Sequence, residues 1–237
     1  PTAGELNQQQ RQYVERILRG ISQMSNLVDD LLNLGRIEAG VGLEREPCHL
    51  GAVLARAVDS MRARAAAKGV TLRTEVMSRS SPGPDRVGSP GSDGVASPGS
   101  DGGGSPGSDG VAIVSGDATL LQQAVGNLVE NAIKYTPGGG TVTVGLDVRI
   151  GERRRRAVVT VSDTGIGIAP EDQVRVFEKF YRVKRRDAPD VSGTGLGLAI
   201  VKSIVDRHGG EVWVDSELNE GATFTISLPL SESDSAG

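Results

Sequence analysis

The chain has 237 residues, of which 37% are hydrophobic and 24% are charged, and its net charge is −4. Such a composition is typical of a globular protein, and the negative net charge argues against a nucleic-acid-binding surface. The single cysteine, Cys48, excludes both an internal disulfide framework and a cysteine-rich zinc site. Because no run of about 18 apolar residues occurs, we expect no membrane contact by this part of the protein.

The sequence starts at Pro1 rather than at methionine. We therefore interpret it as a piece of a longer protein, whose upstream part could contain a membrane span or another domain. The low cysteine content fits a reducing compartment. We expect a cytoplasmic location, which includes the cytoplasmic part of a membrane-bound protein.

The first predicted element is a long amphipathic helix over Glu5–Ala39. Its apolar residues recur at intervals of three and four, and they include Val14, Ile17, Ile21, Met24, Val28 and Leu31. A helix of this length, about 50 Å, is too long for one small domain to cover its apolar stripe. We therefore expect a bundle or coiled-coil partner to cover this stripe.

Shorter helices and strands are predicted after this helix. In chain order they are a linker at 44–47, a helix at 51–68, a strand at 70–77, a short strand at 112–114 and a helix at 120–135 with Asp117 as its N-cap. Strands at 141–150 and 157–162, a loop-rich stretch at 163–195, a helix at 196–208 and strands at 211–216 and 222–228 complete the chain. This order predicts an α+β fold, a two-layer α/β sandwich with helices on one side of a mainly antiparallel sheet.

Two segments have unusual composition. Residues 78–110 contain SPGSDG three times and are rich in glycine, proline and serine. Such a segment cannot bury enough apolar surface to offset the entropy lost on ordering, so we predict a disordered insert that can be deleted. The basic run Arg153–Arg156 lies between two predicted strands, and we interpret it as a hairpin turn rather than as a phosphate-binding patch.

The first of four short stretches with candidate chemistry contains Asn127 and Asn131. These residues are four positions apart, so a helix places both side chains on one face. Asparagine is a poor helix former, and its carbonyl oxygen suits a hard cation such as Mg²⁺. Two exposed polar residues are the alternative interpretation.

The second stretch starts at Asp163, directly after a predicted strand, and continues through Gly165 and Gly167. A carboxylate there can accept hydrogen bonds from an exocyclic amine such as that of adenine, and the glycines let the backbone approach a flat ring. A common turn containing aspartate and glycine is the alternative.

The third and fourth stretches have features that favour binding of an anion. Residues 177–182, FEKFYR, place two phenylalanines as apolar anchors beside Lys184, Arg185 and Arg186, which could reach phosphates. Residues 193–198, GTGLGL, open a helix whose free N–H groups and positive dipole end attract anions. Their spacing matches neither the dinucleotide-binding GxGxxG motif nor a P-loop.

In this order the four stretches resemble the N, G1, F and G2 motifs of sensor histidine kinases, and the resemblance extends from about residue 50 to residue 230. Residues 25–40 resemble the second helix of the dimerisation and phosphotransfer hairpin of that family. The resemblance implies a Bergerat-type ATP-binding fold. It divides the chain into 1–43, the second hairpin helix, 44–231, the catalytic domain with the insert at 78–110, and 232–237, a tail.

The resemblance also implies site residues, cofactors and partners. Mg²⁺ would contact Asn131 with Asn127 nearby, Asp163 would bind the adenine amino group, and Asn127, Lys134 and Arg182 would act in catalysis, with Arg182 at the γ-phosphate. The other implied nucleotide-binding residues are Tyr135, Gly165, Gly167, Ile168, Phe180, Gly193, Thr194, Gly195, Leu196, Gly197 and Leu198, together with Lys134. A lid over 164–192, a homodimer formed through the first helix, and a response regulator as partner are implied as well.

The sequence departs from the family pattern at the phosphoacceptor. The family carries a histidine followed by an acidic residue and a proline on the first hairpin helix, whereas this chain has only His49 and His208. Neither lies in such a motif, and His208 precedes Gly209, where we expect it to bind the last carbonyls of a helix. We interpret both histidines as structural, so the implied acceptor lies outside this sequence.

Two other functions stay open at this point. ATPases of the gyrase, MutL and heat-shock chaperone type share the nucleotide pocket but carry a glutamate one turn before the Mg²⁺ asparagine, where this chain has Asn127. An amide cannot accept a proton at neutral pH. The adjacent Glu130 lies about 100° around the helix from Asn131. A non-catalytic nucleotide-sensing dimerisation module is the third interpretation.

Overall fold

The computed structural model describes residues 6–40, 42, 44–76, 112–150, 155–183 and 193–231. The predicted insert at 78–110, the tail at 232–237, and Lys184, Arg185 and Arg186 lie outside these residues.

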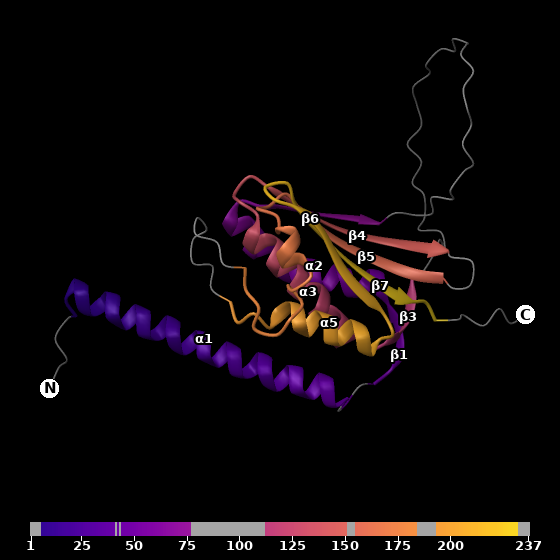
Figure 1. Ribbon diagram of the computed structural model, residues 1–237, viewed down its shortest axis with the longest axis horizontal. Helices are drawn as coiled ribbons and strands as arrows, with labels where there is room; N and C mark the ends of the chain where they lie inside the picture. Colours follow the sequence, from indigo (N-terminus) through magenta and orange to yellow (C-terminus); the bar gives the residue numbers. More distant parts are fainter. Residues whose placement is uncertain are drawn as a thin grey trace, which may run out of the picture.

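A long N-terminal helix, α1 (Gln8–Ala39), runs along one side of the body (Figure 1). Asn7 starts it through a capping box, since its side chain accepts a hydrogen bond from the Gln10 N–H while the Gln10 side chain accepts one from Asn7. Gly40 ends it in a left-handed conformation with a φ of 71°. Only two of its apolar side chains, Leu34 and Ile37, are buried. Most of the predicted apolar stripe is therefore exposed in a single chain.

The body is a five-stranded sheet with the strand order β2-β4-β5-β7-β6. Its strands are β2 (Thr71–Val76), β4 (Thr141–Ile150), β5 (Arg155–Asp163), β6 (Glu211–Glu217) and β7 (Gly221–Pro229). Only β2 and β4 pair in parallel, and every other pair is antiparallel. The helices α2 (Leu50–Lys68), α3 (Ala118–Tyr135) and α5 (Gly197–Arg207) cover one face (Figure 1). This arrangement confirms the predicted two-layer sandwich.

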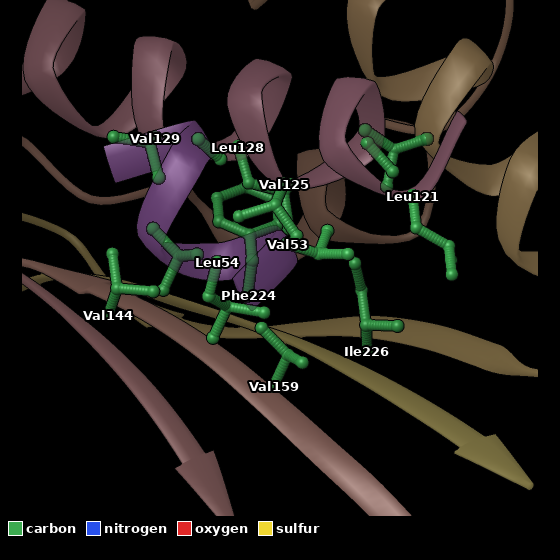
Figure 2. Packing of buried hydrophobic residues seen from close by; sticks show 14 of the residues in the cluster. Val53, Leu54, Leu121, Val125, Leu128, Val129, Val144, Val159, Phe224 and Ile226 are labelled. Atoms are coloured by element: carbon green, nitrogen blue, oxygen red, sulfur yellow. The ribbon is translucent and has the colours of Figure 1, made fainter. Parts of the chain in front are cut away.

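The core lies between this sheet and its helices. Figure 2 shows Val144, Val159, Phe224 and Ile226 of the sheet opposite Val53 and Leu54 of α2 and Leu121, Val125, Leu128 and Val129 of α3. All of these side chains are buried. Burial of each large apolar side chain contributes roughly 1.5–3 kcal/mol. The alternation along the strands and the three- and four-residue spacing along α3 therefore direct these residues to one shared layer.

His208 ties α5 to the start of α3. Its ring is buried, with Nδ1 2.7 Å from the carbonyl oxygen of Ile204, and Nε2 accepts a hydrogen bond of 2.9 Å from the Asp117 N–H. This pair of contacts requires a neutral ring with its hydrogen on Nδ1. Burial lowers the pKa of His208. The expectation that His208 binds a helix-end carbonyl is confirmed, as is the N-cap role of Asp117.

Three details of local structure differ from the expectations. The predicted linker at 44–47 overlaps strand β1 (Glu46–His49), which pairs with β3 (Ile113–Gly116). Short-range pattern cannot reveal a partner so distant in the sequence, and Pro47 is tolerated because β1 pairs on one side only. Within the predicted loop-rich stretch, α4 (Pro170–Gln173) forms where a proline at the first helical position precedes two acidic residues.

The third difference concerns the basic run. The strands β4 and β5 pair antiparallel, as a hairpin requires, but Arg155 and Arg156 begin β5 rather than forming its turn. Residues 153 and 154 lie outside the described ranges. Arg156 donates to the Ser227 hydroxyl at 2.6 Å across the sheet. The guanidinium therefore pairs with the neighbouring strand.

Within the described residues, none of the helices combines the length and the apolar composition that a bilayer span requires.

Candidate functional site

Asn127 of α3 lies at the junction with the start of α5, and Asn131 follows it one helical turn later. The side-chain amide of Asn127 donates a hydrogen bond of 3.3 Å to the carbonyl oxygen of Gly197. This bond uses the amide nitrogen and leaves the Asn127 carbonyl oxygen as an acceptor. Among the described residues, the half-buried amide side chain of Asn131 has no hydrogen-bond partner. Amide oxygens of this kind, one helical turn apart, suit a hard cation.

The C-terminal end of α3 presents a positive charge beside an aromatic ring. The ammonium of Lys134 lies 5.1 Å from the centre of the Tyr135 ring. Burial lowers the pKa of Lys134, and the nearby charge of Arg182 lowers it further. Lys68 of α2 donates to the carbonyl oxygens of Ile133 and Lys134, at 2.9 and 2.5 Å. Lys68 thereby fixes the helix end that carries these residues.

Asp163 lies at the end of β5 with a side chain only 8% exposed. Its carboxylate accepts a hydrogen bond of 2.8 Å from the Gly165 N–H. Burial raises the pKa of Asp163, and hydrogen bonds from the backbone of Gly165 and Ala222 oppose that shift. A Cβ atom at Gly165 would lie 2.6 Å from the Asp163 carboxylate and 2.7 Å from the Tyr135 carbonyl oxygen. Only glycine fits between these two groups.

Gly167 and Ile168 lie against the end of β6 and the turn that follows it. Gly167 has a φ of 63°, and a Cβ there would collide with the carbonyl oxygen of Glu217. The Ile168 N–H donates to the Ser216 hydroxyl at 2.8 Å. Both residues therefore hold the Asp163 loop against the β6–β7 turn.

The two phenylalanines of the third stretch differ in their surroundings. Phe177 packs edge-to-face against Phe224 of β7, with ring centres 6.2 Å apart. Phe180 is 56% exposed and has a φ of 64°. The expectation of two apolar anchors is correct for Phe177 and wrong for Phe180, because the left-handed backbone directs the latter side chain to solvent. The Phe180 N–H instead donates to the carbonyl oxygen of Gly195 at 2.9 Å.

The glycine-rich stretch contacts the asparagine-containing and the phenylalanine-containing stretches. A Cβ at Gly193 would lie 2.7 Å from the Lys134 ammonium nitrogen, and one at Gly195 would lie 2.9 Å from the Phe180 backbone. At Gly197, by contrast, a Cβ would have no described atom within 4 Å. Glycine is therefore required by the protein itself at Gly195, whereas at Gly197 space is left open beside the backbone.

The remaining residues of this stretch anchor it. Leu196 is fully buried and Leu198 packs against the core, so their side chains face the interior. The Thr194 hydroxyl accepts a hydrogen bond of 3.3 Å from the Leu196 N–H and donates one of 2.7 Å to the Asp30 carboxylate of α1. Sequence reasoning missed Asp30 and Lys68, because nothing in local pattern signals a contact between distant elements.

Glu130 is engaged in an ion pair with a neighbouring helix. Its carboxylate pairs with Arg64 of α2 at 2.7 Å. An open hollow of about 470 Å³ elsewhere shares only Asp163 with the residues expected to bind nucleotide. Because that hollow also contains Asp215, Glu217 and Glu220, it would repel phosphate groups, and we do not regard it as the nucleotide site.

Two family matches cover much of the chain. Residues 116–232 match the family described as histidine kinase-, DNA gyrase B-, and HSP90-like ATPase. Residues 2–40 match the His kinase A (phospho-acceptor) domain, although this stretch contains no histidine.

Curated relatives of the chain are sensor kinases. It is 32% identical over 226 residues to the sensor-like histidine kinase SenX3 of Mycobacterium tuberculosis, which is 92% of this chain and 45% of the relative. It is 47% identical over 110 residues to the sensor histidine kinase RppB of Synechocystis, covering 46% of this chain and 23% of the relative. The chain therefore spans less than half the length of these relatives.

Solved structures agree with these relatives. The mycobacterial sensor histidine kinase MprB has 28% identity and a TM-score of 0.56, over 78% of this chain and 97% of that one. Full-length ShkA, solved in complex with AMPPNP, has 28% identity and a TM-score of 0.66, over 96% of this chain and 40% of ShkA. The second similarity includes both the long helix and the sandwich.

Proposed function

The chain belongs to the sensor histidine kinase family, and on that premise we propose that it binds Mg²⁺·ATP and transfers the γ-phosphoryl group to a histidine outside its own sequence. The observation that carries the proposal is the meeting of four separate sequence stretches at one place. The Asn127 amide donates to the Gly197 carbonyl oxygen, the Ile166 N–H donates to the Tyr135 carbonyl oxygen, and the Phe180 N–H donates to the Gly195 carbonyl oxygen. The AMPPNP complex of ShkA supports a nucleoside triphosphate as the ligand.

In this proposal Asp163 accepts a hydrogen bond from the adenine amino group. The carboxylate is fixed by the Gly165 N–H and largely buried, so it is an oriented acceptor in a partly desolvated place. Tyr135 and the backbone beside Gly165 border the base. The phosphates would then extend toward Lys134 and the start of α5, where free N–H groups and positive charge favour an anion.

Mg²⁺ fits the donor set offered by Asn127 and Asn131. Their amide oxygens are hard, uncharged ligands, and such ligands leave room for waters and phosphate oxygens around the ion. When bound, the ion would neutralise phosphate charge. Asn127 and Asn131 would orient it, while Lys134 and Arg182 would place positive charge along the triphosphate.

The reaction itself requires placement more than covalent chemistry from the protein. A nitrogen of the acceptor imidazole forms a bond to the γ-phosphorus as the bond from that phosphorus to the β,γ-bridging oxygen breaks, and ADP leaves. His49 is exposed at the start of α2 and His208 is buried in the core. Neither lies on α1, so the acceptor belongs to another segment.

Hydrolysis of ATP by water is disfavoured in this site. The position of the catalytic glutamate in related ATPases is occupied by Asn127, which donates to a backbone carbonyl. Glu130 does not replace it, because its carboxylate is paired with Arg64 of α2. A steady-state phosphate-release assay of wild type and Asn127→Glu separates the two functions. If wild type released phosphate as fast as the variant does, the kinase proposal would be contradicted.

The proposed assembly is a homodimer formed through α1, with a response regulator as the recipient of the phosphoryl group. The exposed apolar side chains of α1 supply the dimer contact, in line with the match of residues 2–40 to the phospho-acceptor domain. Labelling with γ-labelled ATP tests the kinase proposal. We expect no label on this chain alone and label once a helix with an acceptor histidine is joined upstream; its absence there would overturn the proposal.

A further inference from the structure

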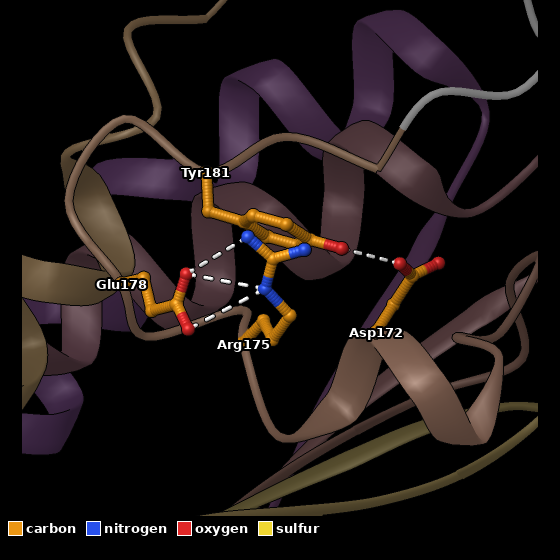
Figure 3. Close-up of polar contacts among 4 residues, drawn as sticks. All are labelled: Asp172, Arg175, Glu178 and Tyr181. Carbon is orange, nitrogen blue, oxygen red and sulfur yellow. Dashed lines mark hydrogen bonds and ion pairs between the residues drawn. The ribbon is translucent and has the colours of Figure 1, made fainter.

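A compact polar cluster surrounds Tyr181, just before Arg182. The Tyr181 hydroxyl donates to the Asp172 carboxylate of α4 at 2.5 Å, and the Arg175 guanidinium lies 4.3 Å from the centre of the Tyr181 ring. Glu178 completes the cluster through an ion pair of 3.2 Å with Arg175. Figure 3 shows the arginine stacked on the ring, with the two carboxylates on opposite sides.

The backbone around Tyr181 is fixed on its other side. The preceding residue, Phe180, has a φ of 64° and donates its N–H to the carbonyl oxygen of Gly195. A non-glycine residue in this conformation costs about 1 kcal/mol or more, so neighbouring contacts must hold it. The Gly195 bond and the Asp172 bond are the contacts that do so. Tyr181 is thus held between α4 and the glycine-rich stretch.

The residue that follows this fixed point is Arg182. Its positive charge lies near both Lys134 and Tyr135, since it lowers the pKa of Lys134 and opposes the burial that raises the pKa of Tyr135. An anionic group near Lys134 and Arg182 would be attracted by both charges. Because Arg182 directly follows Tyr181, the contacts that fix Tyr181 also fix the backbone from which the Arg182 side chain extends.

We propose that Asp172 and Tyr181 form a clamp that positions Arg182 for the terminal phosphate, and so sets the preference for a nucleoside triphosphate over a diphosphate. The inference rests on the proposed nucleotide site. Tyr181 and Asp172 act through Arg182 and touch no ligand themselves. The exposed ion pair between Arg175 and Glu178 contributes little, because solvent screens it.

The test compares two nucleotides on the whole chain by titration calorimetry, with Mg²⁺·AMPPNP and Mg²⁺·ADP as probes. Tyr181→Phe removes only the hydroxyl, and Asp172→Ala removes its acceptor. Both should weaken AMPPNP binding about three- to tenfold, the value of one lost hydrogen bond, and leave ADP binding within about twofold. Asp172→Asn keeps a carbonyl acceptor and should restore most of the preference.

The same substitution made in an Arg182→Ala variant isolates the role of Arg182. In Arg182→Ala, the further change Tyr181→Phe should have no effect on AMPPNP, because the group it positions is gone. Tyr13→Phe on α1 is the matched control and should bind both nucleotides as wild type does. Equal losses for both nucleotides, or a loss that persists without Arg182, would overturn the clamp. Failure of the wild type to bind either nucleotide would instead overturn the proposed function.

Discussion

The hydroxyl of Thr194 donates a hydrogen bond of 2.7 Å to the carboxylate of Asp30, which joins the glycine-rich stretch to α1. Glu38, two turns further along α1, pairs with Lys179 at 2.7 Å. Between them Leu34 is buried. One face of α1 thus contacts the glycine-rich and phenylalanine-containing stretches, and its apolar stripe lies elsewhere. The position of α1 and the occupancy of the nucleotide site should therefore depend on each other.

Replacement of Asp30 by asparagine should strengthen nucleotide binding. Asparagine still accepts the Thr194 hydrogen bond, so the change removes mainly a negative charge beside the stretch proposed to bind phosphates. A charge interaction of about 1 kcal/mol predicts a gain of roughly fivefold in affinity for Mg²⁺·AMPPNP. Titration calorimetry measures it. Asp29→Asn, a neighbouring exposed carboxylate, is the matched control, and an equal gain there would show a nonspecific effect of net charge.

Gly197→Ala should separate binding from folding. The position of its Cβ is free of described protein atoms, so the free energy of unfolding should stay within about 0.5 kcal/mol of wild type. If the phosphates approach this backbone, the added methyl group should lower the affinity for Mg²⁺·AMPPNP about tenfold. Denaturation and calorimetry on the same samples measure both quantities. An alanine variant that binds normally would remove Gly197 from the site.

Gly195→Ala, in contrast to Gly197→Ala, should lower the stability of the fold. Its φ is 74°, and a Cβ would press against the Phe180 backbone at 2.9 Å. The strain should reduce the free energy of unfolding by about 1–2 kcal/mol, whether or not nucleotide is present.

His208 should make stability fall in mild acid. Burial lowers its pKa in the folded chain, whereas the unfolded pKa is about 6.5. Below about pH 6.5 the unfolded chain takes up a proton that the folded chain does not, so the free energy of unfolding decreases by up to about 1.4 kcal/mol per pH unit until the folded pKa is reached. Above that pH both states are neutral at this residue and the effect disappears.

Urea denaturation between about pH 7 and about pH 5.5 measures this dependence. His208→Gln should be less stable near neutrality, because the Asp117 N–H loses its acceptor, but its stability should fall less on acidification. His49→Gln, at an exposed position, should keep the wild-type slope. Parallel curves for His208→Gln and wild type would show that His208 does not titrate on unfolding.

The apolar stripe of α1 should mediate dimer formation. Ile21 is 57% exposed in the single chain, and glutamate there would bring charge into a helix–helix contact. Ile21→Glu should shift the chain from dimer to monomer in sedimentation experiments. Asn26→Glu adds the same charge on the opposite side of the helix and should leave the dimer intact. A wild-type monomer, or equal behaviour of both variants, would contradict the dimer.

Local pattern was sufficient for much of the fold. The spacing of apolar residues located α1 and α3. Gly40 ends α1 and Gly69 ends α2, and both glycines adopt a positive φ. Strand β1 was missed because its identity comes from pairing with Ile113–Gly116, far along the chain. A proline within such a short segment also favoured a linker.

The candidate site was predictable as a set of stretches but not as a set of contacts. The order of the motifs indicated which residues to consider, yet the exposure of Phe180 follows from a backbone conformation that composition does not reveal. The links of Asp30 to Thr194 and of Lys68 to the end of α3 join elements distant in sequence. Such contacts depend on packing, which no short-range pattern encodes.

The most direct test of the account is titration of Mg²⁺·ATP into wild type, Asp163→Ala and Asn131→Ala. We expect measurable binding by wild type. Asp163→Ala removes the acceptor proposed for the adenine amino group and Asn131→Ala removes the oxygen proposed for Mg²⁺, so each should weaken binding about tenfold or more. Unchanged affinity in both variants, or no binding by the folded wild type, would contradict the proposed nucleotide site.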